Sequence, residues 1–143
     1  MLPTSPPPGR VLAIDYGTKR VGLAITDPLG IIATPLDTIH SKDLLAYAKA
    51  YHLRERLRAI VVGTPRTLLN EPTDVTSAVV GLLRTLRRDH PGLPIHELDE
   101  RYPSKMAHAA LLAGGLGRKA RQNKALVDQV SATLILQSFL ERM

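Results

Sequence analysis

The chain has 143 residues, a common size for a single domain that buries one hydrophobic core without disulfides. It has no cysteine, which excludes disulfides, thiolate zinc sites and cysteine nucleophiles, and its 3% aromatic content argues against a platform that stacks single-stranded bases. The formal charge of +6 favours a polyanionic partner such as nucleic acid, although small basic proteins are often simply soluble.

The first nine residues are rich in proline, which neither pairs in a sheet nor continues a helix, so we expect a disordered tail at 1–9. Residues 10–143 are expected to form one domain. The N-terminus lacks the apolar segment of a secretory signal, and no apolar run reaches the roughly 18 residues of a membrane span. A cytoplasmic protein with no membrane partner is therefore the expectation.

Short apolar runs bounded by turn residues predict strands, and apolar residues at helical spacing predict helices. In chain order, the pattern predicts strands at 11–14, 21–26 and 33–39, a helix at 41–58 capped by Ser41, a strand at 59–63, a helix at 74–89, a strand at 93–98, and helices at 104–113 and 126–141. A glycine hinge at 114–117 and a basic connector at 118–124 separate the last two helices.

This order of elements predicts an α/β fold. The opening strands form a hairpin and are antiparallel, whereas strands that alternate with helices are typically parallel neighbours. We therefore expect a mixed five-stranded sheet covered by helices, with an antiparallel hairpin at its start.

Two acidic residues directly follow predicted strands. Asp15 comes after the apolar run 11–14, and Glu100 comes after the strand at 93–98 and Asp99. If these strands are parallel, their carboxyl ends meet at one edge of the sheet, where open α/β sheets bind ligands. Both carboxylates are therefore expected at the same edge.

Asp128 belongs to the apolar face of the last predicted helix. Positions three, four and seven apart share a helix face, and from Asp128 this face carries Ala132, Ile135 and, further on, Phe139. Asp128 is thus expected to point toward the sheet. A carboxylate there costs several kcal/mol unless a charge compensates it, and either a bound cation or an arginine would do so.

Each acid also has an ordinary explanation. Asp15 could be a turn residue that bonds its own backbone, Glu100 could pair with Arg101 or face solvent, and Asp128 could favour the helix dipole from the first turn. Convergence of all three on one edge favours a metal site, and oxygen ligands suit Mg²⁺ or Mn²⁺ rather than zinc. The histidines show no ligand spacing and are expected at the surface or in packing: His40, His52, His90, His96 and His108.

The stretch Asp15-Tyr16-Gly17-Thr18-Lys19-Arg20-Val21-Gly22-Leu23-Ala24 resembles the opening motif of the bacterial YqgF/RuvX family. Members of this family are described as candidate Holliday junction resolvases or pre-16S rRNA nucleases. Further matches follow in order, so the resemblance covers residues 11 to about 141. They are Asp27-Pro28-Leu29-Gly30, Ile60-Val61-Val62-Gly63, Asp99-Glu100-Arg101, and Val127-Asp128 with Ala132 and 134–137.

The resemblance implies a ribonuclease-H-like fold and phosphodiester hydrolysis by two metal ions, Mg²⁺ or Mn²⁺. It places the catalytic acids and metal ligands on Asp15, Glu100 and Asp128. The chain departs from the family pattern at 64–70, after Gly63, and at 102–104, after the Asp-Glu-Arg motif. Both departures lie beside the expected site, so substrate preference could differ.

Basic residues near these acids are expected to contact phosphates, although a solvated charged surface is the alternative for each of them. The connector at 118–124 carries four cations and no acid directly before the last helix, where it could guide a polyanion. The expected nucleic-acid contacts are Lys19, Arg20, Arg101, Lys105, Arg118, Lys119, Arg121 and Lys124.

The resemblance leaves two substrates open: the 5′ end of precursor 16S rRNA and a Holliday junction. A resolvase cuts two symmetric strands as a dimer, whereas the apolar stripes here are needed for the sheet and the connector repels its own copy. We therefore favour structured RNA and a monomer over branched DNA and a homodimer. Two other functions are less favoured. Actin-like ATPases and sugar kinases share the ribonuclease-H-like core, but they need a second lobe to enclose the nucleotide, and this chain has no residues for one. A non-catalytic assembly factor would not need the three acids that this chain retains.

Overall fold

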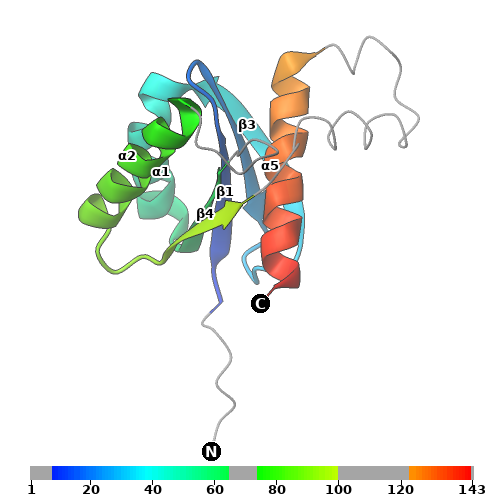
Figure 1. The fold of residues 1–143 in the computed structure, drawn as a ribbon. Helices are drawn as coiled ribbons and strands as arrows, with labels where there is room; N and C mark the ends of the chain where they lie inside the picture. The colour runs from blue at the N-terminus through cyan, green and yellow to red at the C-terminus, as the bar shows by residue number, and fades with distance from the viewer. Residues whose placement is uncertain (1–7, 65–73, 100–122, 143) are drawn as a thin grey trace, which may run out of the picture.

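A computed structural model gives the architecture of the chain and describes residues 8–64, 74–99 and 123–142. Within these ranges, five strands form one sheet with helices on both faces (Figure 1). The strands are β1 (Arg10–Tyr16), β2 (Arg20–Thr26), β3 (Ala33–His40), β4 (Leu57–Thr64) and β5 (Ile95–Asp99). The helices are the 3₁₀-helix η1 (Ser41–Asp43) and the α-helices α1 (Leu44–Glu55), α2 (Asp74–Asp89) and α5 (Lys124–Glu141).

The sheet has the strand order β3-β2-β1-β4-β5. β1 pairs antiparallel with β2, and β2 pairs antiparallel with β3, so the opening segment forms a meander. β1 pairs parallel with β4, and β4 pairs parallel with β5. The predicted mixed five-stranded sheet with an antiparallel opening hairpin is confirmed.

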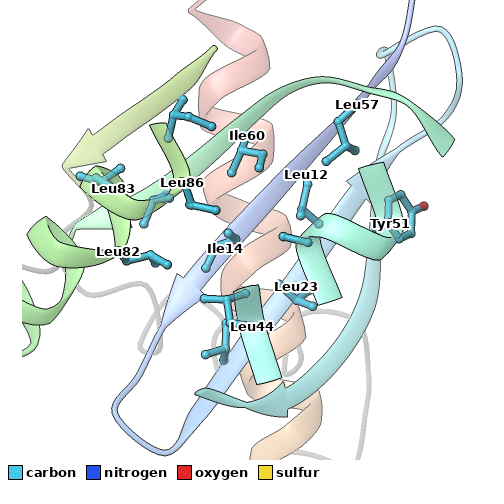
Figure 2. Close-up of a cluster of buried hydrophobic side chains, with 14 of the residues drawn as sticks. Leu12, Ile14, Leu23, Leu44, Tyr51, Leu57, Ile60, Leu82, Leu83 and Leu86 are labelled. Carbon is cyan, nitrogen blue, oxygen red and sulfur yellow. The ribbon is translucent and has the colours of Figure 1, made fainter. Parts of the chain in front are cut away.

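Side-chain alternation along β1 divides the interior into two layers. Leu12 and Ile14 point to the face that α1 and α2 cover, and Figure 2 shows this cluster around them. Val11 and Ala13 point to the opposite face, where they pack with Ala132 of α5. Because β1 is central and buried on both faces, it reads as a continuous apolar run, as expected for a strand with parallel pairing.

The segment between β3 and β4 differs from its predicted bounds. Ser41 does not cap a helix; the ring of His40 accepts a hydrogen bond from the Lys42 amide at the start of η1. α1 then ends at Glu55, because Arg56 has a positive φ of 57° that reverses the chain. β4 therefore begins at Leu57, two residues earlier than the apolar pattern predicts.

The other described elements lie within two residues of their predicted ends, and α2 has the predicted bounds. Several predicted features fall wholly or partly outside the described residues: 1–7 of the tail predicted at 1–9, the helix at 104–113, the hinge at 114–117, and 118–122 of the connector. Among the described helices, none has the length and apolar character needed to cross a membrane.

Candidate active site

Asp15 lies inside β1 rather than in the turn after it. It pairs with Gly22 on β2 and with Gly63 on β4, so its backbone is held from both sides. Val11 and Ala13 face α5, and the two-residue period of a strand puts the Asp15 side chain on that same face. The alternative that Asp15 is a turn residue is therefore wrong.

Asp128 lies on α5, which packs across β1, β2 and β3. Asn123 caps this helix by accepting a hydrogen bond from the Leu126 amide at 3.2 Å. The hydroxyl of Thr38 on β3 donates to the Ala125 carbonyl at 2.7 Å and fixes the same end. Because α5 begins at Lys124, Asp128 lies beyond its first turn, and the helix-dipole explanation for this acid is wrong.

Two glycines allow α5 to lie close to the sheet at the level of Asp15. A Cβ on Gly22 would overlap the backbone carbonyl of Asp128, and a Cβ on Gly63 would overlap the side chain of Ile135. These are the two cross-strand partners of Asp15. Sequence reasoning missed this role, although a glycine inside a strand is a known sign of close backbone approach.

The electrostatics of Asp15 are unusual for a carboxyl group. Burial, and secondarily the negative charge of Asp128, raise the pKa of Asp15 from 3.8 to about 7. Within the described ranges, no hydrogen bond or cation compensates the Asp15 carboxylate. The structure thus brings two of the three predicted acids together, and it leaves one of them without a counter-charge among the residues it describes.

Asp128 does have a counter-charge. The Nε of Arg20, the first residue of β2, donates to Asp128 Oδ2 at 2.6 Å. This hydrogen bond and the charge of Asp128 raise the pKa of the Arg20 guanidinium. The sequence predicts that either a bound cation or an arginine compensates the charge of Asp128. In the structure, the arginine Arg20 does so. Arg20, predicted as a phosphate contact, is engaged within the acidic site.

The remaining predicted residues divide between exposed positions and undescribed ones. Lys19 is exposed in the turn between β1 and β2, where Ser41 fixes the turn by donating from its amide to the Lys19 carbonyl at 3.0 Å. Lys124 is exposed at the start of α5. The following predicted residues lie outside the described ranges: Glu100, Arg101, Lys105, Arg118, Lys119 and Arg121.

Glu100 comes directly after Asp99, the last residue of β5. Asp99 pairs with Thr64, and the neighbouring register pairs align Leu98 with Gly63 and Gly63 with Asp15. β5 therefore ends at the sheet edge where β1 carries Asp15. Among the described residues, no three His, Asp or Glu side chains gather as a metal-binding group.

The described histidines take part in packing and local hydrogen bonds. His52 Nδ1 accepts from the Leu57 amide at 2.9 Å, its ring contacts the ring of His90, and the ring of His96 contacts Phe139. These contacts agree with the prediction that the histidines serve packing or lie at the surface. His108 is outside the described residues.

The fold is similar to that of RuvC. The structure of T. thermophilus RuvC in complex with Holliday junction substrate superposes with a TM-score of 0.59 at 20% sequence identity, covering 94% of this chain and 96% of that chain. T. thermophilus RuvC alone superposes with a TM-score of 0.54 at 18% identity and the same coverage. At this identity the likeness shows the fold alone, a RuvC-like ribonuclease-H-like fold, as predicted.

Proteins found by sequence comparison are more similar to this chain than these solved structures are. The chain is 47% identical over 132 residues to the Amoebophilus asiaticus protein named "Putative pre-16S rRNA nuclease", covering 92% of this chain and 94% of the relative. A protein of the same name from Phocaeicola vulgatus is also 47% identical, with 92% and 95% covered. The model of the RuvX family, described as Holliday junction resolvase, matches residues 9–142. The chain therefore belongs to the RuvX family.

Proposed function

We propose that this chain is a divalent-metal-dependent nuclease that hydrolyses phosphodiester bonds at the 5′ end of precursor 16S rRNA, in the cytoplasm. The observation that carries the proposal is the placement of Asp15 and Asp128, from elements far apart in the sequence, on one face at the carboxyl end of β1. Open α/β sheets bind their ligands at this edge.

The donor chemistry of the site fits a hard divalent cation. Two carboxylates lie close enough for the charge of one to raise the pKa of the other, and only Asp128 has a cationic partner among the described residues. Hard cations such as Mg²⁺ and Mn²⁺ prefer oxygen ligands, and the described part of the site offers neither thiolate nor imidazole. A divalent cation would relieve the repulsion that the site contains.

Asp15, Asp128 and Glu100 would hold the metal ions. When bound, divalent cations supply Lewis-acid polarisation of the phosphoryl group and lower the pKa of water. Asp15 is fixed by strand pairing on both sides, and Asp128 is fixed by the cap and the Thr38 contact of α5. Such rigid elements hold ligands in place without reorganisation.

Exposed cations of this chain would bind the nucleic-acid backbone. Lys19 lies in the turn that joins the strand of Asp15 to the strand of Arg20. Lys124 lies at the start of the helix that carries Asp128, and it ends the basic connector 118–124. Together with the net charge of +6, these positions favour a polyanionic substrate that approaches the acids from this edge.

The choice of RNA rests on the relatives, whose names give pre-16S rRNA as their substrate. A second candidate is Holliday junction resolution, because the family description and the complex of T. thermophilus RuvC name that substrate. A resolvase makes paired symmetric cuts, which requires a two-fold dimer, whereas single cuts at an RNA end suit the monomer that we expect.

One preparation should be tested on a 5′-extended precursor 16S rRNA fragment, an RNA duplex and a DNA four-way junction. We expect cleavage of the precursor in Mg²⁺ or Mn²⁺, loss with excess EDTA, and no specific gain from zinc. Sedimentation at micromolar concentration should show a monomer. A stable dimer that makes symmetric, ligatable nicks in the junction and spares the precursor would instead establish the resolvase.

A further inference from the structure

The contact between Arg20 and Asp128 joins two segments separated by 108 residues, and it lies within the acidic site itself. The N–O distance of 2.6 Å is short for a charge-assisted hydrogen bond. Asp128 is mostly buried, with 17% of its side chain exposed, whereas 48% of the Arg20 side chain is exposed. A guanidinium from the solvent side thus covers a carboxylate oxygen that lies deeper in the molecule.

A structural role alone accounts poorly for this pair. The start of α5 is already held by the Asn123 cap, the Thr38 hydrogen bond and the close approach of the helix at Gly22. An ion pair with a half-exposed partner adds little to folding stability. What the pair does supply is a positive charge on one of two neighbouring carboxylates, which would otherwise repel each other.

A divalent cation at this site would compete with Arg20. The Arg20 guanidinium holds only one of the two Asp128 oxygens, Oδ2, but a divalent cation on the same carboxylate would place a second positive charge beside it. Because half of its side chain is exposed, Arg20 can rotate away without opening the core. Its planar guanidinium would then be free at the rim of the site, where it matches the geometry of a phosphate.

We propose that Arg20 is a built-in counter-ion of Asp128: its guanidinium occupies the position of a cation on Oδ2 in the metal-free protein, a divalent cation displaces it, and the released guanidinium binds a substrate phosphate. This inference rests on the proposed metal-dependent function. It gives Arg20 opposite effects on the two ligands, since it competes with the metal but supports binding of the nucleic acid.

Titration with Mn²⁺ in the absence of nucleic acid tests the first effect, by calorimetry and by the electron paramagnetic resonance signal of free Mn²⁺. In Arg20→Gln the cation no longer has to displace a charge-assisted hydrogen bond from Asp128. We therefore expect this substitution to lower the Kd for Mn²⁺ by about ten-fold. Arg88→Gln is the matched control, because Arg88 also pairs with a carboxylate, Asp89 Oδ1 at 3.1 Å, on another element. Its Kd for Mn²⁺ should equal that of the wild type.

The same variants test the second effect with the precursor RNA fragment. Arg20→Gln should weaken RNA binding in Mg²⁺ and lower the slope of log Kd against log salt by about one, whereas Arg88→Gln should change neither. An unchanged or higher Kd for Mn²⁺ in Arg20→Gln overturns the counter-ion role. Unchanged RNA binding overturns the release to phosphate.

A measurement on the wild-type protein covers the case in which Arg20→Gln fails to fold. The Nε–H resonance of Arg20 should be shifted and protected in the metal-free protein and should move to the position of a free arginine as Mg²⁺ saturates the site. A resonance that stays unchanged at saturation overturns the proposal. If the wild type does not bind Mn²⁺, or binds it with a Kd that Asp128→Asn leaves unchanged, the proposed function is overturned as well. If Asp128→Asn abolishes Mn²⁺ binding but Arg20→Gln leaves the Kd unchanged, the counter-ion role alone is overturned.

Discussion

The backbone of Asp128 lies directly against Gly22, so closely that a methyl group on Gly22 would overlap the Asp128 carbonyl. Gly22 is also the strand partner of Asp15. One residue without a side chain therefore sets the separation between the strand and the helix that carry the two described acids. Any group added at this point must move α5 away from the sheet.

Gly22→Ala should lower both stability and activity. The added methyl meets backbone rather than a flexible side chain, so α5 must shift, and overpacking of this kind costs about 1–3 kcal/mol. Nuclease activity should fall more than the loss of folded protein explains, because Asp128 moves with the helix. Urea unfolding and cleavage assays of the folded fraction measure the two effects.

Gly81→Ala is the matched control. Gly81 is exposed in α2, and nothing lies within 4 Å of the position that its Cβ would take. Replacing an exposed helical glycine with alanine should raise stability by roughly 0.5–1 kcal/mol and leave activity unchanged. Equal stability and activity in Gly22→Ala and the wild type would contradict the close approach of α5.

The sequence predicts the sheet well because its central strands are buried on both faces. The apolar runs that contain Leu12 and Ile60 correctly mark β1 and β4. Their ends are less predictable, because pairing rather than hydrophobicity extends a strand: Asp15 is polar, yet it pairs on both sides. The end of α1 depends on the conformation of Arg56, which no local pattern reveals.

The candidate site is predictable in part. The position of Asp128 on the apolar stripe of its helix indicates that it faces the sheet, and α5 does pack against Gly22 at that point. The partnership of Arg20 with Asp128 could not be predicted, because it depends on the register of two elements that are distant in the sequence. The role of Gly63 against Ile135 is likewise tertiary.

Asp15→Asn should stabilise the metal-free protein, and the gain should grow with pH. The pKa of the Asp15 carboxyl group is about 7 in the folded protein and near its ordinary value of 3.8 in the unfolded chain. Between these pH values the native state binds more protons than the unfolded state. The stability of the wild type therefore falls as pH rises through this range. The free energy of unfolding of the wild type falls by at most about 4 kcal/mol over this range. Asparagine does not ionise, so the variant keeps its stability. Urea unfolding in EDTA at about pH 5 and pH 8 checks this, and an equal effect of the substitution at both pH values would contradict it.

Metal binding should depend on pH through the same group. A cation requires the ionised carboxylate, while the raised pKa of Asp15 keeps a proton on it below about 7. The Kd for Mn²⁺ of the wild type should therefore rise by up to about ten-fold per pH unit below pH 7 and level off above it. Calorimetric titrations across this range measure the dependence; a constant Kd would show that Asp15 does not ligate the metal.

The basic connector should contribute sequence-independent binding. Replacing Arg118, Lys119, Arg121 and Lys124 with Gln should weaken binding to all nucleic acids alike. It should also flatten the salt dependence of binding, by about one unit of slope for each phosphate that the variant no longer neutralises. Binding titrations between low and moderate salt report the slope. An unchanged slope would mean that the connector does not bind phosphates.

The most direct test of the account is single-turnover cleavage of 5′-extended precursor 16S rRNA in Mn²⁺ by the wild type and by Asp15→Asn, Glu100→Gln and Asp128→Asn. Glu141→Gln serves as the control, because Glu141 is an exposed acid at the end of the same helix as Asp128. We predict that each of the three substitutions abolishes cleavage while the protein stays folded, and that Glu141→Gln cleaves like the wild type. Cleavage near the wild-type rate in any two of the three variants would contradict the assignment of the acids.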